Sequence, residues 1–361
     1  MKKGRIVIAS VLKPVDDTRM YEKMACTLLH SNDYEITLIG QAIDQIPVNQ
    51  GIEFVPFKVT ERFGLERFLV PIKVLLKLFK VRPDLLIVNT HELLIVSLIN
   101  RILFGSVIVY DIRENYYRNI RFSETYSPKL RLPLSWWIRG KEKLFARLFH
   151  HIILAEKSYA TELGFIGKRF TILENKALPP KDITKASSGV HKLLFTGTIS
   201  KSTGVFEAIT LATALHKVDQ DIRLLIAGFC ALPRTRAELL ERIQDKPFIQ
   251  LKGFYQLVPH QEIIAEIERA DFGIMYYPPS PHTSGAIPTK LFEYMANQLP
   301  IITWANQPYA PRIVEQNAGL LWDVPEVLLD KMKTQSFYPK PAEGVYWESK
   351  IFTDLIEKLV R

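Results

Sequence analysis

The chain of 361 residues is 47% hydrophobic and 24% charged, which is typical of a globular protein with about two domains. Its only cysteines, Cys26 and Cys230, lie far apart in apolar stretches. We therefore expect neither a disulfide framework nor a cysteine metal site, and a reducing cytoplasm fits. The formal net charge of +9 favours an acidic partner, which could be nucleic acid, anionic lipid or a phosphorylated small molecule.

The chain begins with two lysines and a short apolar run at residues 5–12. Ser10 interrupts this run, and Lys13 and Pro14 follow it without a small-residue cleavage site. We therefore interpret it as a buried strand rather than a signal peptide. No apolar segment approaches the roughly 20 residues that span a bilayer, so we expect no membrane-spanning helix.

Apolar, β-rich runs alternate with helical patterns along the first half of the chain. Strands are expected at residues 5–11, 35–39, 85–89, 107–111, 151–155 and 171–174, with helices between them such as 18–31 and 138–149. This βαβ series predicts a parallel sheet covered on both faces, with ligands at the carboxyl ends of the strands.

Two basic segments of this half combine lysines and arginines with apolar residues. A helix expected at 68–80 carries a stripe of lysines, and 129–147 surrounds Trp136 and Trp137 with basic residues. This mixture suits docking on an anionic membrane surface. Ordinary helices that pack on a sheet and expose their lysines to solvent are the alternative, and both interpretations stay open.

A polar stretch with prolines and serines at 177–189 is typical of a linker. A second alternating series follows it. Strands are expected at 192–196, 222–227, 249–252, 272–276 and 300–303, with helices at 204–217, 234–244, 259–270 and 290–297. The economical architecture is α/β, with two Rossmann-like domains at 1–180 and 181–335 and a cleft between them.

The most informative segment runs from Ser284-Gly285 through Pro288, Lys290 and Glu293. Pro288 favours a first helical turn, and Lys290 and Glu293 stand three residues apart on one helix face. Free backbone N–H groups at the helix start attract a phosphate, Lys290 adds a positive charge, and Glu293 can accept hydrogen bonds from a diol such as ribose. The segment predicts a pocket for an anionic ligand, and an amphipathic helix without a ligand is the alternative.

These segments resemble glycosyltransferases of family 4, which have the two-domain GT-B fold. The resemblance is strongest at 288–300 and extends, in decreasing order, to 195–204, 225–228, 16–19, 88–92 and 109–116. Residues 346–348 look like the start of the family's terminal helix, so the segment 336–361 is expected to cross back to the first domain.

The resemblance implies a UDP- or GDP-linked sugar donor bound by the second domain and a glycan or lipid-linked acceptor bound by the first. Transfer would retain the anomeric configuration and need no metal or other cofactor. Such a reaction must stabilise an oxocarbenium-like sugar and a departing diphosphate. The donor-binding residues implied are Gly197, Thr198, Lys201, Ser284, Gly285, Lys290 and Glu293.

In the first domain the resemblance implies a catalytic group of Arg113, His91 and Asp17 and acceptor contacts from Arg19 and Glu114. Each has a plainer alternative. Asp17 could cap the next helix with Arg19 solvated in its first turn, and His91 could be an ordinary hydrogen-bonded histidine at a strand end. We hypothesise that Arg113 supplies positive charge to the diphosphate.

The chain departs from the family pattern at four positions. Thr198 and Thr203 stand where an Arg and a Lys are usual, Gly285 replaces the first of two glutamates, and Arg113 replaces a histidine. A non-catalytic GT-B subunit of a glycan assembly complex is therefore kept as an alternative. So is a nucleotide-sugar epimerase, although its acid/base cluster is not found. No nucleic-acid-binding module is recognisable.

The function we expect is that of a glycosyltransferase in surface polysaccharide or glycoconjugate biosynthesis. It would be cytoplasmic, at the inner face of the cell membrane. The donor base, the sugar and the acceptor depend on pocket contacts that the sequence does not show.

Overall fold

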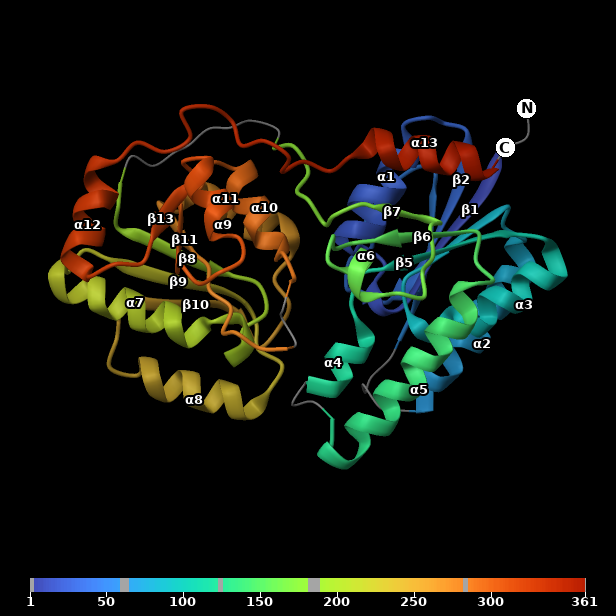
Figure 1. The fold of residues 1–361 in the computed structure, drawn as a ribbon, viewed down its shortest axis with the longest axis horizontal. Coiled ribbons are helices and arrows are strands. Elements are labelled where there is room, and N and C mark those ends of the chain that lie inside the picture. Colours follow the sequence, from blue (N-terminus) through green and yellow to red (C-terminus); the bar gives the residue numbers. More distant parts are fainter. Residues whose placement is uncertain (1–2, 59–64, 123–125, 181–188, 282–284, 361) are drawn as a thin grey trace. The chain divides into compact units, whose positions relative to one another are not determined.

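The computed structural model describes residues 3–58, 65–122, 126–180, 189–281 and 285–360. It divides into two compact units: unit 1 comprises Met1–Asn175 and Trp347–Arg361, and unit 2 comprises Lys176–Tyr346. Each unit is built on one parallel β-sheet with helices on both faces (Figure 1). The predicted α/β class is therefore confirmed.

The sheet of unit 1 has seven parallel strands in the order β3-β2-β1-β4-β5-β6-β7. Their bounds are β1 Gly4–Pro14, β2 Tyr34–Gln41, β3 Ile52–Phe57, β4 Leu85–Val88, β5 Val107–Ile112, β6 His151–Leu154 and β7 Phe170–Ile172. The six strands expected from the sequence are confirmed. Strand β3 was not predicted, because Pro56 interrupts it and only Ile52 and Phe57 within it are buried. An edge strand tolerates both features.

Two layers of helices cover this sheet. The helical segments are η1 Thr18–Ala25, α1 Cys26–Leu29, α2 Leu65–Val81, η2 His91–Leu93, α3 Leu94–Phe104, α4 Tyr116–Phe122, α5 Pro128–Ala146, α6 Tyr159–Glu162 and α13 Ser349–Val360. Helices α2, α3 and α5 share one core with Val7 and Ala9 of β1, whereas α1 and α13 lie on the opposite face (Figure 1). Ile6 and Ile8 alternate with Val7 and Ala9, so β1 is buried on both sides.

A buried ion pair fixes helix η1 to strand β5. The side chains of Arg19 and Asp111 are fully buried, and Nε and Nη2 of Arg19 donate to the two carboxylate oxygens at 2.8 and 2.7 Å. Nη1 donates to the Leu173 carbonyl at 2.9 Å, and the guanidinium lies 5.5 Å from the centre of the Trp347 ring. One cation thus joins segments from the beginning, middle and end of unit 1.

The sheet of unit 2 has six parallel strands in the order β10-β9-β8-β11-β12-β13. Their bounds are β8 Lys192–Thr196, β9 Arg223–Phe229, β10 Ile249–Phe254, β11 Phe272–Ile274, β12 Ile301–Thr303 and β13 Gly319–Leu321. The five expected strands are confirmed. Strand β13 was missed because Gly319, a poor strand former, takes one of its three positions.

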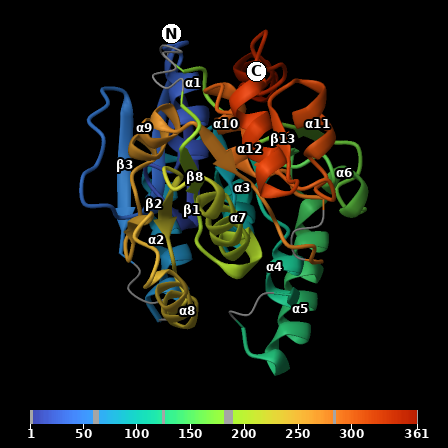
Figure 2. The same cartoon turned by 90° about the vertical axis from the view of Figure 1, so that its left-hand side faces the viewer.

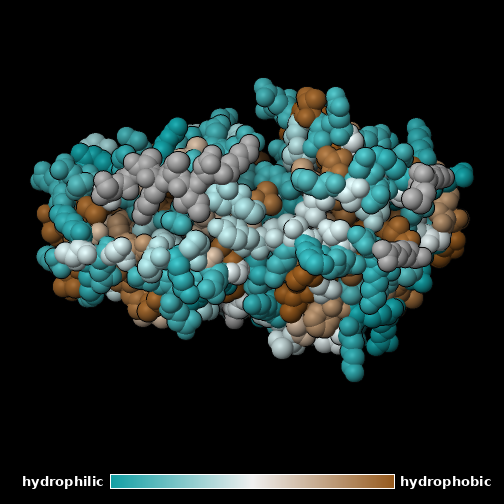
Figure 3. Space-filling view, turned by 90° about the horizontal axis from the view of Figure 1, so that it is seen from above, coloured by the Kyte–Doolittle hydropathy of each residue, from teal (hydrophilic) through white to brown (hydrophobic). Residues whose placement is uncertain are grey.

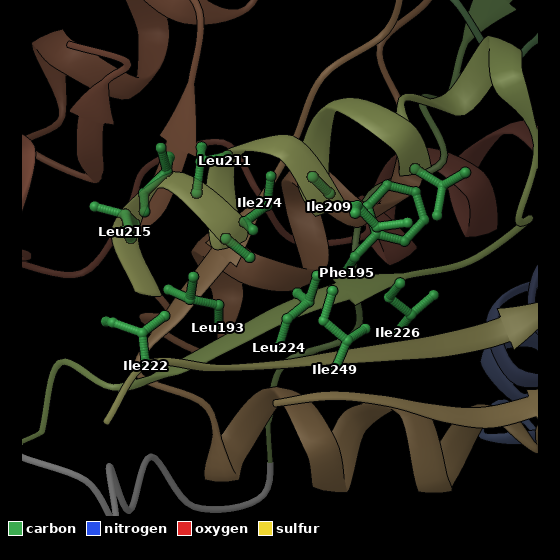
Figure 4. Close-up of a cluster of buried hydrophobic side chains, with 14 of the residues drawn as sticks. Leu193, Phe195, Ile209, Leu211, Leu215, Ile222, Leu224, Ile226, Ile249 and Ile274 are labelled. Atoms are coloured by element: carbon green, nitrogen blue, oxygen red, sulfur yellow. The ribbon is translucent and has the colours of Figure 1, made fainter. Parts of the chain in front are cut away.

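The helical segments of unit 2 are η3 Lys201–Thr203, α7 Val205–Val218, α8 Pro233–Ile243, α9 His260–Arg269, α10 Thr289–Ala296, α11 Ala310–Glu315 and α12 Pro325–Thr334. The four expected helices are confirmed. Helices α7 and α8 lie on one face of the sheet and α9, α10 and α11 on the other (Figures 1 and 2). On the α7 side, Leu211 and Leu215 meet Leu193, Phe195 and Leu224 from the strands (Figure 4).

Among the described residues, none of the helices combines the length and the hydropathy that crossing a bilayer requires. Because every sheet is parallel, the loops that follow the strands gather at one edge of each sheet. These are the edges where the sequence predicts the functional residues.

We expect Arg19→Met to lower the free energy of unfolding by about 3–5 kcal/mol, because Asp111 would then be buried without its counter-charge. Urea unfolding followed by tryptophan fluorescence measures this change. The double variant Arg19→Met/Asp111→Leu should recover most of the loss.

The matched control is Lys350→Met, which breaks an exposed pair with Asp354 on α13. It should cost less than about 1 kcal/mol. A loss of that small size in Arg19→Met would show that the buried pair does not hold unit 1 together.

Candidate functional site

Lys290, in the first turn of α10, is a buried cation without a hydrogen-bond partner. Its side chain is buried, at 6% exposure, and its Nζ has no partner among the residues that the structure describes. The ammonium lies 4.1 Å from the ring centre of Phe195 and 4.9 Å from that of Tyr277. Burial lowers the pKa of Lys290 to about 7. Two aromatic faces satisfy none of its three N–H donors, so the position fits an anionic ligand.

Helix α10 is fixed to the end of β8 through Tyr294. The Tyr294 hydroxyl accepts a hydrogen bond from the Thr196 backbone N–H at 3.1 Å and lies 2.9 Å from the Thr196 Oγ1. The Tyr294 ring packs so closely on Gly273 that a Cβ there would lie 2.5 Å from it. The start of α10 therefore has a fixed position beside the loop that begins at Gly197.

The loop after β8 makes close backbone contact with the end of β9. Gly197 has φ +99°, and its N–H donates to the Ala227 carbonyl at 3.0 Å. No atom of the residues described in the structure lies within 4 Å of the position of a Cβ. At Gly228 a Cβ would lie 1.8 Å from the Gly197 carbonyl oxygen. The missing side chain of Gly228 thus allows the loop after β8 to approach β9. The missing side chain of Gly197 leaves open space on the outer side of that loop.

Two of the residues that depart from the family pattern stabilise this loop. Thr203 Oγ1 donates to the Thr198 carbonyl at 2.7 Å and accepts from the Ser200 N–H at 3.1 Å. Lys201 is half-exposed and forms an ion pair with Glu238 of α8 at 2.6 Å. A hydroxyl therefore closes the turn at Thr203, and the Lys201 charge is already paired in this structure.

Glu293, one turn after Lys290, pairs with a histidine that sequence reasoning did not select. Glu293 Oε1 lies 3.0 Å from Nε2 of His260, the first residue of α9. The two are 33 residues apart, and no motif links them. This pairing orients the Glu293 carboxylate, which is largely buried.

A pocket of about 570 Å³ lies between the loops after β11 and β12. Its lining includes Tyr277, Gly285, Gln307 and Tyr309. The Gln307 amide accepts from the Tyr277 N–H at 3.0 Å and donates to the Tyr277 carbonyl at 3.1 Å, while the Tyr309 hydroxyl donates to Gln307 Oε1 at 2.7 Å. Tyr277 therefore joins this pocket to the Lys290 ammonium. The predicted Ser284 lies outside the described residues.

In unit 1, Asp17 caps a helix, as the plainer alternative anticipated. Its Oδ1 accepts from the backbone N–H groups of Arg19 and Met20, both at 3.1 Å. Arg113 also donates to both carboxylate oxygens, at 2.7 and 3.1 Å. Burial alone would raise the pKa of Asp17, but the Arg113 charge and hydrogen bonds lower it to about 2. The pair stays ionised at neutral pH.

The two residues expected to contact an acceptor have different surroundings. Arg19 is neither solvated nor accessible in this structure, since Asp111 and a carbonyl occupy its guanidinium. Glu114 is partly exposed, where it accepts from Lys13 at 2.8 Å and from Asn119 at 2.8 Å. Of the two, only Glu114 has a side chain at the surface.

His91, just after β4, is buried and neutral at pH 7. Its Nδ1 lies 3.1 Å from the Lys141 Nζ and 3.6 Å from the nearer oxygen of Glu92. Burial lowers the pKa of His91 to about 4 and that of Lys141 to about 8. Because an ammonium only donates, Nδ1 is the acceptor and the proton of His91 is on Nε2. His91 is thus hydrogen-bonded at a strand end, as the plainer alternative describes, and its role in transfer stays a prediction.

Among the described residues, one His/Asp cluster could hold a metal ion. It consists of His191, Asp219 and Asp221, whose donor atoms lie within 4.8 Å of one another. These residues precede β8 and β9, at the opposite edge of the sheet from Gly197, and Asp219 already accepts from Lys333 at 2.9 Å. The cluster is therefore no part of the Lys290 site.

Comparison with known proteins identifies the class. Residues 190–334 match the family model described as Glycosyl transferases group 1. Anabaena HepE, solved with UDP and glucose, is 15% identical with a TM-score of 0.65, covering 98% of each chain. Sucrose-phosphate synthase from Thermosynechococcus elongatus is 12% identical with a TM-score of 0.65, covering 99% of this chain and 95% of that one.

WaaG, a glycosyltransferase involved in lipopolysaccharide biosynthesis, is 14% identical with a TM-score of 0.59 and covers 98% of this chain and 90% of its own. No curated protein matches the chain in sequence. The fold is that of GT-B glycosyltransferases. The chain is a glycosyltransferase, and the match to the glycosyl transferases group 1 family model extends over residues 190–334 alone. The narrower assignment to family 4 stays a prediction.

We expect Gly228→Ala to destabilise the chain by about 2 kcal/mol or more, because the added Cβ would push the Gly197 loop away from β9. In a thermal melt this corresponds to a lowering of roughly 4–8 °C. The control is Gly140→Ala on α5, where a Cβ meets nothing and a helical alanine stabilises slightly. An unchanged midpoint in Gly228→Ala would contradict the close approach.

Proposed function

We propose that this glycosyltransferase moves a sugar from a UDP- or GDP-linked donor to a glycan or lipid-linked acceptor, and that unit 2 binds the donor. The unpartnered, buried ammonium of Lys290 carries this proposal. A nucleotide diphosphate supplies the negative oxygens that would satisfy its N–H donors. The positive end of the α10 dipole and the open space beside Gly197 favour the same anion.

The same arrangement serves the chemical step. As the bond between the sugar and the diphosphate breaks, negative charge grows on the leaving phosphate. An ammonium that is already desolvated and fixed between Phe195 and Tyr277 stabilises that charge without reorganising. The low local dielectric strengthens the interaction. Lys290 would therefore act more strongly on the transition state than on the bound substrate.

Glu293 is proposed to accept hydrogen bonds from the ribose hydroxyls. His260 holds one of its oxygens, which leaves acceptor capacity on the carboxylate. The aromatic wall of Tyr277 and the amide of Gln307 suit a sugar ring, which combines apolar faces with hydroxyl edges. The donor sugar is therefore proposed to lie in the pocket between the loops after β11 and β12.

Unit 1 is proposed to bind the acceptor at the carboxyl ends of its strands, with Asp17, Arg113, Glu114 and the Nε2–H of His91 as polar contacts. Retention of configuration, with the leaving phosphate taking the acceptor proton, would explain why no general base is needed. Independence of metals belongs to the same proposal. So does a role in surface polysaccharide or glycoconjugate biosynthesis on the cytoplasmic side of a membrane, which the likeness to WaaG supports.

The test is a thermal-shift panel of UDP, GDP, ADP, CMP and their sugar conjugates. A ligand at about a hundred times its Kd adds roughly 2.7 kcal/mol and raises the midpoint by several degrees. Lys290→Met should bind the selected nucleotide about 10- to 100-fold more weakly, since a charge-assisted hydrogen bond contributes about 1.5–3 kcal/mol. Without ligand its midpoint should be unchanged or higher, because a desolvated charge is removed.

Lys246→Met is the matched control, because that lysine pairs with Asp245 away from the proposed site. Undiminished nucleotide binding by Lys290→Met would refute the assignment of Lys290. No shift with any nucleotide in the unaltered chain would favour the non-catalytic alternative. Interconversion of free nucleotide sugars without an acceptor would favour the epimerase.

The pKa of Lys290 predicts a pH dependence. Below pH 7 the free chain already carries the charge that the diphosphate needs, whereas above pH 7 binding must take up a proton. The affinity for UDP or GDP should therefore fall towards tenfold per pH unit between about pH 7.5 and 9. Titration calorimetry in buffers of different ionisation enthalpy measures both the affinity and the proton uptake. A dependence of the same steepness in Lys290→Met would assign it to another group.

A further inference from the structure

Helices α2, α3 and α5 of unit 1 expose an unusual share of the hydrophobic side chains. Of the 24 large hydrophobic side chains exposed among the described residues, 12 lie on these three helices, which have 17, 11 and 19 residues. Scattered exposed leucines need no explanation, but such clustering does. The side chains are Leu69, Ile72, Leu76, Phe79, Ile95, Ile102, Leu103, Leu130, Leu132, Trp136, Trp137 and Leu144.

The three helices form one layer on the sheet of unit 1 (Figure 1). The Phe79 ring of α2 meets Phe104 of α3 edge to face at 5.2 Å, and Arg101 of α3 donates to the Leu148 carbonyl just after α5. We call the outward side chains of this layer the α2–α3–α5 face. In the view of Figure 3, by contrast, hydrophobic residues form small separate groups among hydrophilic ones.

The same helices carry an excess of positive charge. Together with Arg147, which follows α5, they carry eleven Lys and Arg against two Glu, an excess of nine that equals the formal net charge of +9 of the whole chain. One of the two glutamates, Glu142, is buried and accepts from Tyr110. Lys73, Lys80 and Lys143 are exposed. The α2–α3–α5 face is therefore both apolar and cationic.

Two neighbouring tryptophans on α5 further define the chemistry of the α2–α3–α5 face. Trp136 and Trp137 are 60% and 57% exposed, yet each is held in place: Trp136 by the Tyr117 ring at 5.6 Å, and Trp137 by the Lys141 ammonium at 4.6 Å from its centre. Indoles and long basic side chains among aliphatic residues suit the boundary between lipid headgroups and acyl chains.

We propose that the α2–α3–α5 face docks on the surface of an anionic lipid bilayer. The leucines and tryptophans would enter the headgroup region while the lysines and arginines meet lipid phosphates. Nucleic acid would satisfy the charge but leave the apolar residues in water. A second copy would bring two strongly positive faces together. The inference does not depend on the transfer reaction, because it uses no residue of the proposed donor site.

The test is flotation of the full chain with vesicles of phosphatidylcholine alone or mixed with phosphatidylglycerol. Binding is expected to the mixed vesicles, to weaken as salt rises, and to shift the tryptophan emission to the blue. Trp136→Ser/Trp137→Ser and, separately, Lys73→Glu/Lys80→Glu/Lys143→Glu should each weaken binding at least about tenfold. The lysine variant changes only exposed side chains, so it keeps the test valid if the tryptophan variant misfolds.

The matched controls are Tyr255→Ser/Leu257→Ser and Lys192→Glu/Lys217→Glu in unit 2, whose residues are equally exposed. They should bind vesicles as the unaltered chain does, and all variants should keep their nucleotide-induced thermal shift. Absence of binding to the mixed vesicles, or binding that both α2–α3–α5 variants retain, would overturn the proposal. So would a dimer that the tryptophan variant dissociates and that binds no vesicles, which would assign the face to a second copy.

Discussion

The constraint on which this structure depends is that a parallel sheet must be covered on both faces. Strands such as β1 are buried on either side, so each unit needs two helical layers and long right-handed crossovers to supply them. Polar chemistry is then displaced to the edge where the strands end. Gly197 after β8, Tyr277 after β11, Gln307 after β12 and the Asp17–Arg113 pair in unit 1 all lie at such edges. These residues lie at the strand ends because helices must cover both faces of each sheet.

Arg19 and Lys290, both deeply buried, show how burial separates structural from ligand-binding roles. Arg19 has a carboxylate, a carbonyl and an aromatic ring around it, so its charge is satisfied within unit 1. Lys290 has aromatic rings but no acceptor among the residues that the structure describes. The first arrangement stabilises the fold and exposes no donor. The second keeps a destabilising charge whose donors a diphosphate would satisfy.

The sequence predicted the long, apolar strands and the helices between them, because their periodicity is a local property. It missed β3 and β13, where a proline and a glycine interrupt the apolar pattern. It placed the start of α5 ten residues late because Pro133 lies within that helix. Whether these two strands form, and where α5 begins, is decided by packing against neighbouring elements. Local propensity alone therefore could not predict them.

Lys290 and Glu293 were also predictable as candidate site residues from their local spacing. His260, Gln307 and the burial of Arg19 were not, since each depends on a partner 30 to 92 residues away. A charged side chain near the start of a helix looks the same in sequence whether it faces solvent or an aspartate in the core. Only the fold distinguishes the two.

The return of the chain to unit 1 has a consequence for synthesis. Trp347 donates to Thr27 and lies beneath the Arg19 guanidinium, and Val360 of α13 packs beside Gly4. These contacts come from residues translated after all of unit 2. While unit 2 is being made, the face of the first sheet around Ile6 and Ile8 lacks part of its cover. The ribosome therefore releases unit 2 as a continuous stretch able to fold in order, whereas one face of the sheet in unit 1 is completely covered only when α13 has been made.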